Sequence, residues 1–329
     1  MTTKRRTFLG LALAAPAVAR AQAAFPSRPI RFILPFPPGG AIDVIARLLA
    51  EHMSPALGQP GETARFPLVI ENRPGAVGTI GADVVAKAPP DGHTFMLTIN
   101  STITSSAALY PNLPFDPMTA FTPIGMAVHA SILLTAPKAA PFNDAPGFIA
   151  WAKALGRPVN YGTWGNGSAA HLFGEVLHQD HKVPMEHIPF RGEAAAITEM
   201  LGGRIDVSFA TPVSVLSHIQ AGAVKGLAMT GSNRSSSMPD LSTFTEQGVT
   251  GLDLATFDAV WGPAGMPKPI VDRINAAMND ALRVPAVQAK LIEIGHTPAP
   301  GTPEGLGALV REVTPRWHAL IRKAGVKVT

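Results

Sequence analysis

Short apolar segments alternate with segments of helical periodicity along almost the whole chain, and this alternation limits the fold more than any other feature. Residues 30–36, rich in Ile, Phe and Leu, are expected to form a strand that ends at a turn rich in Pro and Gly. After the turn, apolar residues recur at three- and four-residue spacing from Ile42 to Met53, as on the buried face of a helix. Repeated strand–helix–strand units predict largely parallel, doubly wound sheets covered by helices.

These units fall into two series, which predict an α/β protein with two lobes. The expected strands are residues 30–36, 68–71, 94–99, 131–136, 159–163, 185–190, 206–209 and 226–229, with a further apolar run at 254–261. Helical periodicity is found after residue 40 and at 81–88, 145–155, 169–178, 193–201, 213–221, 269–282, 286–294 and 303–323. The last three helices bring no sheet of their own, so we expect them to pack on the first lobe. The first lobe would then comprise residues 24–124 and 249–329, and the second 125–248.

The first 23 residues have the pattern of an export signal peptide. A basic segment containing Arg5 and Arg6 precedes an apolar stretch at residues 8–19, and small residues at Ala21 and Ala23 form a cleavage signal. The apolar stretch is shorter than the roughly 20 residues needed to span a bilayer. Its Arg-Arg-x-Phe-Leu order resembles a twin-arginine signal, and an ordinary Sec signal is the alternative. Cleavage near Ala23 would leave a periplasmic protein.

The charge balance changes once this segment is removed. The leader carries four basic residues and no acidic residue, so the Lys and Arg count falls from 27 to 23, equal to the 23 Asp and Glu. A neutral chain without a run of Lys or Arg is not expected to bind nucleic acid. The sequence contains no Cys, which excludes disulfides, thiolate metal ligands and a cysteine nucleophile.

Two glycine-rich turns between a strand and a helix are the candidate binding residues. The first turn spans residues 35–43 and contains Phe36, Pro38, Gly39, Gly40, Ala41 and Asp43. The second spans residues 161–168 and contains Trp164, Gly165, Asn166, Gly167 and Ser168. The first N–H groups of a helix have no partner inside it and attract anions. One such turn in each lobe, facing the other across a crevice, would suit a carboxylate. The alternative is that both turns only connect strands to helices.

Neither turn matches a nucleotide-binding motif, and no cofactor is expected. No Gly-Lys-Ser or Gly-Lys-Thr follows either turn, and the glycines of the second have the reverse of dinucleotide-binding spacing. The chain also has no Gly-x-Ser-x-Gly or His-Glu-x-x-His motif, so an enzyme is not expected.

Several residues near the turns have both a structural and a functional interpretation. Asp43 falls in a first helical turn, where a carboxylate stabilises the helix, although it could line a pocket. His171, His178 and His181 are expected to be packing or surface residues, because His171 and His178 are two helical turns apart. Four aromatic residues at strand ends are core residues by default, with a pocket wall as the alternative: Phe36, Trp164, Phe190 and Trp261.

At these residues the sequence resembles the tripartite tricarboxylate transporter receptor family, the TctC-like or Bug periplasmic solute-binding proteins. The matching motifs cover essentially the whole mature chain and include residues 25–30, 35–43, 71–76, 86–92, 109–117, 165–171, 188–192 and 263–267. The resemblance implies a type II periplasmic binding protein fold, a Venus flytrap, that closes on a small carboxylate without catalysis. It also implies that the two glycine-rich turns hold the carboxylate. The motif at 188–192 adds Pro189, Phe190 and Arg191 to the candidate ligand-binding residues, and that at 165–171 adds His171.

The sequence departs from the family pattern at two positions. Ala210 follows Phe209 where many relatives carry an acidic residue, and Asp258 lies in an apolar run where they usually carry an aromatic one. Strand alternation puts Asp258 and Val260 on the face opposite Phe257 and Trp261, so either face could line the crevice. If the Asp258 face does, the carboxylate could receive a ligand N–H or ammonium; otherwise Asp258 is solvated or structural.

The leading hypothesis is a periplasmic carboxylate receptor that acts as a monomer. It would serve a tripartite-type membrane permease or, alternatively, a sensor kinase. From a different class, a periplasmic α/β hydrolase or lyase would use His171 or Asp43 as acid or base.

Overall fold

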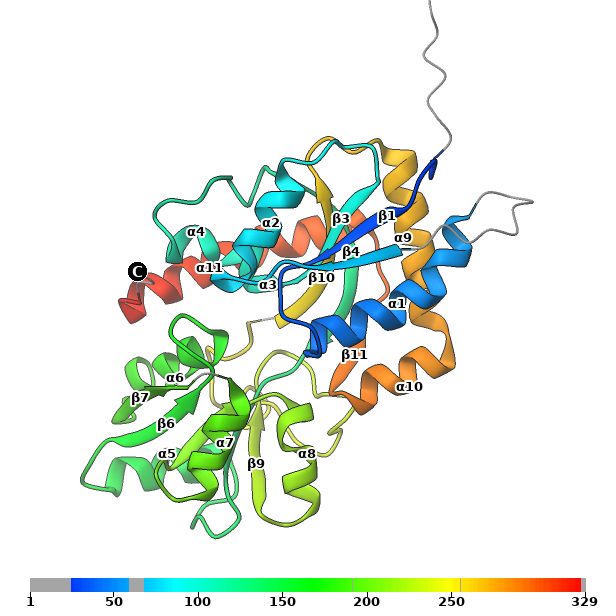
Figure 1. The fold of residues 1–329 in the computed structure, drawn as a ribbon. Helices are drawn as coiled ribbons and strands as arrows, with labels where there is room; N and C mark the ends of the chain where they lie inside the picture. Colours follow the sequence, from blue (N-terminus) through cyan, green and yellow to red (C-terminus); the bar gives the residue numbers. More distant parts are fainter. Residues whose placement is uncertain (1–24, 59–67, 191, 255, 327–329) are drawn as a thin grey trace, which may run out of the picture.

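The computed structural model describes residues 25–58, 68–190, 192–254 and 256–326 and places them in two α/β lobes (Figure 1). Each lobe is built on one sheet, and the chain passes from the first lobe to the second and back. This arrangement confirms the two-lobed α/β fold predicted from the alternation of strands and helices. The expected signal peptide lies outside the described residues. No helix in the described ranges is long and apolar enough to cross a bilayer.

The first lobe contains a sheet in the order β11-β4-β10-β3-β1-β2. These strands are β1 (Ile30–Leu34), β2 (Leu68–Asn72), β3 (Thr94–Ile99), β4 (Phe121–Ala130), β10 (Thr256–Pro263) and β11 (His296–Pro298). The first three are parallel to one another, whereas β10 is antiparallel to both β3 and β4, and β11 is antiparallel to β4. The sheet is therefore mixed, because the strand that returns from the second lobe inserts between β3 and β4.

Helices cover both faces of the first sheet. The helices α1 (Ala41–Leu57), α9 (Lys268–Arg283) and α10 (Pro285–Glu293) pack their apolar sides with residues such as Phe32 and Val260 on one face. The opposite face is covered by α2 (Thr79–Ala86) with its preceding 3-10 turn Ala76–Gly78, α3 (Asn100–Thr104), α4 (Ser106–Leu109) and α11 (Pro303–Ala324). The C-terminal helices α9, α10 and α11 pack on this sheet and divide between its two faces.

The second lobe has a sheet in the order β7-β6-β8-β5-β9. Its strands are β5 (Leu133–Pro137), β6 (Val159–Thr163), β7 (Met185–Pro189), β8 (Val207–Ala210) and β9 (Val224–Met229), and β5 is antiparallel to both of its neighbours. Its helices are α5 (Ala145–Ala154), α6 (Ala169–Gln179), α7 (Glu193–Leu201) and α8 (Pro212–Gln220). Residues of α5 and α6 share one core with α11 of the first lobe, while α7 and α8 pack on the opposite face.

The strand β4 corrects the expected boundary between the lobes. All of Phe121–Ala130 lies in the first sheet, so a boundary between residues 124 and 125 would cut a strand. The chain crosses to the second lobe between Ala130 and Leu133 and returns between Met229 and Thr256. Sequence analysis missed β4 because Pro123 and Gly125 interrupt its apolar pattern. A proline is tolerated there because β11 pairs only with residues 128–130, so the outer side of β4 near Pro123 has no strand partner among the described residues.

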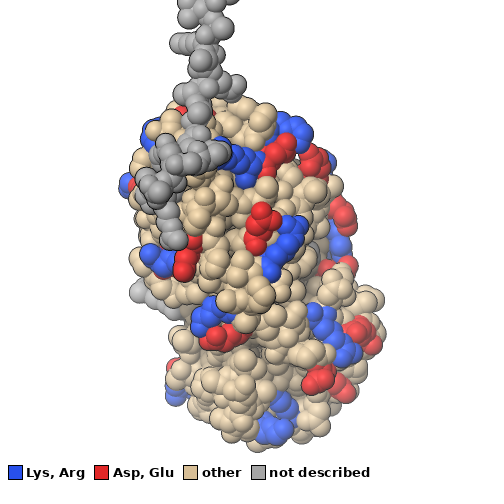
Figure 2. Space-filling model, turned by 90° about the vertical axis from the view of Figure 1, so that its right-hand side faces the viewer, with Lys and Arg blue, Asp and Glu red and all other residues tan. Residues whose placement is uncertain are grey.

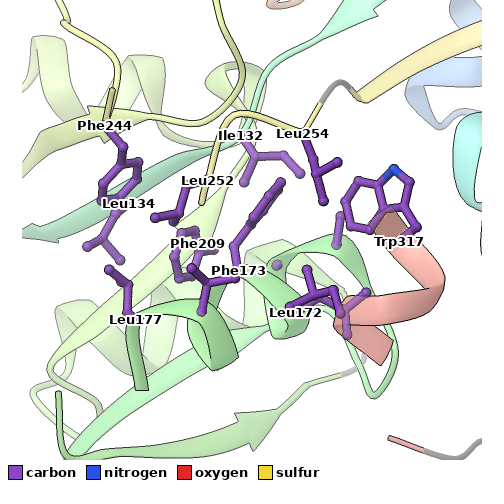
Figure 3. Packing of buried hydrophobic residues seen from close by; sticks show 14 of the residues in the cluster. Ile132, Leu134, Leu172, Phe173, Leu177, Phe209, Phe244, Leu252, Leu254 and Trp317 are labelled. Carbon is purple, nitrogen blue, oxygen red and sulfur yellow. The ribbon is translucent and has the colours of Figure 1, made fainter. Parts of the chain in front are cut away.

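The C-terminal helix α11 joins the cores of the two lobes. Trp317 of α11 lies beside Leu172 and Phe173 of α6 (Figure 3), with the Trp317 and Phe173 ring centroids 5.6 Å apart. Two ion pairs flank this contact: Lys323 with Asp180 of the second lobe, and Arg316 with Asp253 of the returning segment. A helix assigned by sequence to the first lobe therefore also closes the core of the second.

The charged side chains on the face shown in Figure 2 lie in small groups of both signs. Among the described residues, opposite charges also form ion pairs, for example Arg31 with Glu71 and Arg28 with Asp91. Interspersed charges keep the local field weak, which is consistent with the equal numbers of basic and acidic residues after residue 23.

Candidate functional site

A cavity of about 630 Å³ lies between the two lobes and takes its walls from both. Its first-lobe lining residues are Phe36, Ala41, Ile42, Val77, Ile99, Asn100, Ser101, Ala130, Thr256, Asp258 and His296. Its remaining lining residues are Ile132, Trp164, Asn166, Ser168, Ala169, Glu193, Ala194, Thr211, Val213 and Ser214. Apolar walls with a few polar groups are typical of small-molecule sites.

The first glycine-rich turn is held in place by Asp43. The Asp43 carboxylate accepts hydrogen bonds from Gly39 N–H at 3.1 Å, from Asn72 Nδ2 at 3.1 Å and from Arg47 Nε at 2.8 Å. The bond from Arg47 is the main cause that lowers the Asp43 pKa to about 2. Asp43 is buried and does not line the cavity, so its role is structural. The N–H of Gly39, one of the candidate binding residues, is therefore already bonded and is not an open donor.

The open donors at this turn belong to the helix itself. Ala41 and Ile42 are the first two residues of α1, and both line the cavity. The first hydrogen bond inside the helix is donated by Val44 N–H to Gly40 C=O, so the N–H groups of Ala41 and Ile42 have no partner within the helix. The positive end of α1 therefore faces the cavity with backbone donors available to an anion.

The second turn is organised in the same way around α6. Ser168 caps the helix, since its Oγ accepts from His171 N–H at 3.2 Å and donates to Gly165 C=O at 2.7 Å. Gly167 N–H is donated to His171 Nδ1 at 3.1 Å, and Gly165 N–H to Thr163 Oγ1 at 3.2 Å. Positive φ values of 133° and 74° explain the glycines at 165 and 167. The N–H groups of both glycines are used within the turn, so those of Ala169 and Ala170, the first two residues of α6, remain for a ligand.

His171 supports this turn from behind the cavity. Its ring stacks on His187 with centroids 3.7 Å apart, and His187 Nε2 lies 2.6 Å from Thr163 Oγ1. Because His171 Nδ1 accepts the Gly167 N–H, this imidazole is neutral. Burial lowers the pKa of His171, and burial followed by repulsion from His171 lowers that of His187 to about 3. His171 is thus a positioning residue that does not line the cavity.

The other two histidines considered for metal binding point elsewhere. His178 Nδ1 lies 2.9 Å from Val183 C=O, and His181 Nε2 lies 2.8 Å from Thr250 C=O. In the described ranges, no group of three His, Cys, Asp or Glu is arranged to hold a metal ion.

The structure divides the remaining sequence candidates between the cavity wall and its surroundings. Six of them line the cavity: Phe36, Ala41, Trp164, Asn166, Ser168 and Asp258. Those in the turns that do not are Pro38, Gly39, Gly40, Asp43, Gly165, Gly167 and His171. Away from the wall, Pro189 is exposed, Phe190 packs on Met200 and Ile205, and Ala210 is buried in the second lobe, so none of these three is a lining residue. Arg191 lies outside the described residues.

Sequence analysis missed a third strand-to-helix junction in the cavity wall. Asn100 and Ser101 begin α3 directly after β3, at the carboxyl end of a parallel strand. Asn100 is 4% exposed, and its Nδ2 has no hydrogen-bond partner among the described residues. Ligands bind at the carboxyl ends of parallel strands, and this rule also applies to the junction of β3 and α3. The sequence analysis used glycines to identify such junctions, and this one contains none.

Glu193 is an acid in the cavity wall whose carboxyl group is hydrogen-bonded within the protein. Its Oε2 accepts from Thr211 N–H at 3.0 Å, from Thr211 Oγ1 at 2.7 Å and from Ser214 Oγ. These donors lie at the N-terminus of α8, whose dipole favours a negative charge. Glu193, Thr211 and Ser214 were not predicted, since they meet only when α7 and α8 pack together.

Asp258 on β10 and His296 at the start of β11 form a buried pair on the first-lobe wall. They are 3% and 5% exposed, and His296 Nε2 lies 3.6 Å from Asp258 Oδ2. Burial raises the Asp258 pKa to about 7 and lowers that of His296. Of the two faces of the 254–261 run, the one bearing Asp258 lines the cavity, whereas Phe257 and Trp261 are in the core. His296 and Thr256, which also line the cavity, were missed.

The described lining of the cavity contains two carboxyl groups, one imidazole and no Lys or Arg. A carboxylate bound here would meet helix N-termini and neutral donors instead of a cation. Helix termini provide this kind of anion recognition without a charged side chain.

Known proteins resemble this chain in sequence and in fold. The sequence profile of a family described as "Tripartite tricarboxylate transporter family receptor" matches residues 45–326. A "UPF0065 protein in tcbD-tcbE intergenic region" of Pseudomonas sp. (strain P51) is 36% identical over 97% of this chain and 94% of its own.

Two solved structures are similar in fold as well as sequence. Rpa4515 of R. palustris with adipate has a TM-score of 0.78 and 30% identity, covering 92% of this chain and 100% of its own. MatC from Rhodopseudomonas palustris with bound malate has a TM-score of 0.74 and 31% identity, covering 90% and 100%.

Proposed function

The chain belongs to the tripartite tricarboxylate transporter receptor family, a family of solute-binding receptors, and on this premise we propose that its cavity captures a small carboxylate in the periplasm. The observation that carries the proposal is that α1 and α6, one from each lobe, begin at the cavity wall. Their free N–H groups and helix dipoles would hold a carboxylate from both sides. The adipate and malate held by two neighbours are carboxylates, which supports this ligand class.

Closure of the lobes on the ligand would convert binding into a signal for a membrane partner. We expect that partner to be a permease of the tripartite type, as the family description suggests, with a sensor kinase as the alternative. Deleting the gene and measuring uptake of the identified ligand distinguishes them. Loss of uptake supports the permease, whereas unchanged uptake with lost ligand-induced transcription supports the kinase.

The hydrolase or lyase alternative is not supported by the residues it would use. Asp43 is bonded to Arg47, Asn72 and Gly39, and His171 accepts the Gly167 N–H, so both are engaged behind the cavity wall. Quantitative recovery of unchanged ligand after prolonged incubation would agree with a receptor.

Ligand class is tested by a thermal-shift screen of carboxylates followed by calorimetry. A ligand that binds only the folded protein stabilises it by about 2.7 kcal/mol at a hundredfold excess over Kd. The amide and methyl ester of each hit serve as controls, because they keep the shape and lose the charge. If esters bind as tightly as the acids, carboxylate recognition is refuted.

Proline substitution tests the backbone donors of α1. Ala41 is the first helical residue, and Gly40 before it is extended at φ −80° and ψ 173°, so a proline fits there without disturbing the helix. Ala41→Pro removes one N–H, and Ala41→Val keeps it while adding similar bulk. We expect Ala41→Pro to weaken binding at least about tenfold relative to Ala41→Val, since a hydrogen bond to a charged group contributes about 1.5–3 kcal/mol. Equal affinity of both variants would remove α1 from the site.

A further inference from the structure

Asp258 and His296 are the part of the cavity wall that a carboxylate ligand leaves unexplained. Both side chains line the cavity and are almost wholly buried. An isolated buried carboxylate costs several kcal/mol, and the described residues donate no hydrogen bond to that of Asp258. Glu193 shows the contrast, because its carboxylate has three donors from Thr211 and Ser214.

The orientation of His296 makes the pair a double acceptor when Asp258 is ionised, as it is beside a bound ammonium group. His296 Nδ1 lies 3.0 Å from Ile294 C=O, an oxygen that can only accept, so Nδ1 carries the hydrogen. In the neutral ring, Nε2 then presents a lone pair toward the cavity, next to Asp258 Oδ2. The 3.6 Å between these two atoms exceeds a hydrogen-bond distance, so both remain open to a third group. They are close enough for one nitrogen to donate to each.

The groups around the pair do not supply that nitrogen. In the sheet, Asp258 lies opposite Ile99 of β3 and Val128 of β4, neither of which carries a polar side chain. The cavity residues nearest along these elements, Asn100, Ser101 and Ala130, are not titratable, and Asn100 Nδ2 makes no hydrogen bond to the pair. His296 from β11 and Glu193 from α7 are the other titratable groups in the described lining.

We propose that Asp258 and His296 are specificity-determining residues that select a carboxylate ligand bearing an N–H donor, an ammonium or amide group, and disfavour one whose second polar group is another carboxylate. The inference rests on the proposed function, since the ligand's own carboxylate is held by the helix N-termini. Asp258 holds a proton at mildly acidic pH and releases it when an ammonium group binds, because the ion pair then favours the ionised acid. The released proton passes to the buffer.

The test compares wild type with Asp258→Asn on two matched series of probes. The aliphatic series is 4-aminobutyrate, succinamate, succinate and pentanoate, and the aromatic series is 4-(aminomethyl)benzoate, 4-carbamoylbenzoate, terephthalate and 4-methylbenzoate. Each series keeps one carboxylate and changes only the other end. Glu193→Gln is the matched control, because it neutralises the other acid in the same cavity wall.

In wild type we expect a nitrogen-bearing member to bind at least tenfold more tightly than the dicarboxylate of its series. Asp258→Asn should lose most of that ratio by weakening the ammonium probe and strengthening the dicarboxylate. Glu193→Gln should keep most of the ratio, because Thr211 and Ser214 already donate to the Glu193 carboxyl group. Calorimetry near pH 6 in two buffers of different ionisation enthalpy should show release of up to one proton with the ammonium probe in wild type, and none in Asp258→Asn.

The outcomes separate the two levels of the proposal. If a dicarboxylate or plain monocarboxylate binds wild type more tightly than the nitrogen-bearing probes, the inference is overturned while the carboxylate receptor stands. The same holds if Asp258→Asn leaves the ratio unchanged. If neither the probes nor any acid in the wider screen binds, the proposed function fails and this inference fails with it.

Discussion

Asp258→Asn is expected to stabilise the unliganded protein at neutral pH. In the unfolded chain Asp258 ionises near pH 3.8, whereas in the folded protein its pKa is raised to about 7 by burial. Between these values the unfolded state gives up a proton that the folded state keeps, so wild type loses stability as pH rises from 4 to 7. Asparagine has nearly the same shape as the protonated acid and does not titrate.

The size of the effect follows from the pKa difference. A shift of about three units at about 1.4 kcal/mol each gives an upper bound of about 4 kcal/mol at pH 8. For a chain of this length, that corresponds to a rise in Tm of roughly 3–6 °C. At pH 4 the two proteins should melt together, because protonated aspartate and asparagine are both neutral.

The assay is a series of thermal melts of the two proteins from pH 4 to pH 8. Asp240→Asn is the control, since Asp240 is exposed and the substitution makes the same chemical change at the surface. The reasoning would be refuted if the Tm difference between Asp258→Asn and wild type were the same at every pH, or if the variant were less stable at pH 8.

Three further outcomes are expected from other residues. Lowering the pH from 6.5 toward 3 should destabilise the protein, because His187 is protonated in the unfolded chain but not in the folded state, where its pKa is about 3. His187→Asn should flatten this part of the curve of unfolding free energy against pH, and an unchanged curve would contradict the argument. Trp317→Ala should lower the free energy of unfolding by about 3–5 kcal/mol, and Trp317→Phe by clearly less, because Trp317 is fully buried. Denaturant unfolding measures both losses, and equal losses would argue against a packing role. Asp43→Asn should lower the free energy of unfolding by about 1–2 kcal/mol at pH 7, a modest value because solvent screens part of the ion pair with Arg47. The difference should shrink as pH falls from 4 toward 2, because protonation removes the charge of the Asp43 carboxylate. A difference independent of pH would exclude the ionic contribution.

The fold was largely predictable because its elements have strong local signals. The strands β1, β3, β6 and β8 are short apolar runs that end near Gly, Pro or polar residues, and α9 and α11 have clear helical periodicity. The strands β4 and β11 had no such signal, since Pro123 and Gly125 interrupt one and the other has only three residues. Their place is decided by pairing with β10 and with each other, which is a long-range property.

The candidate site was predictable only where one local rule applied. Glycine-rich junctions identified the beginnings of α1 and α6, which provide Ala41 and Ser168 to the cavity. The same rule overestimated the glycines as donors to a ligand, because Asp43 and His171 accept the N–H groups of Gly39 and Gly167. His296 lies 38 residues after Asp258 in the sequence, and only the order of strands in the sheet brings the two together. No local pattern could have identified that pair.

The position of α11 has a consequence for how the chain acquires its structure after synthesis. The first sheet needs β10 between β3 and β4, and both cores share contacts with Trp317, so neither lobe can be completed before the last third of the chain has been made. Folding during translation would leave the edges of β3 and β4 unpaired for most of the synthesis time. We therefore expect the tertiary structure to form only on the finished polypeptide, with both lobes folding in one cooperative step. A chain ending before Thr256 should be captured by chaperones or degraded.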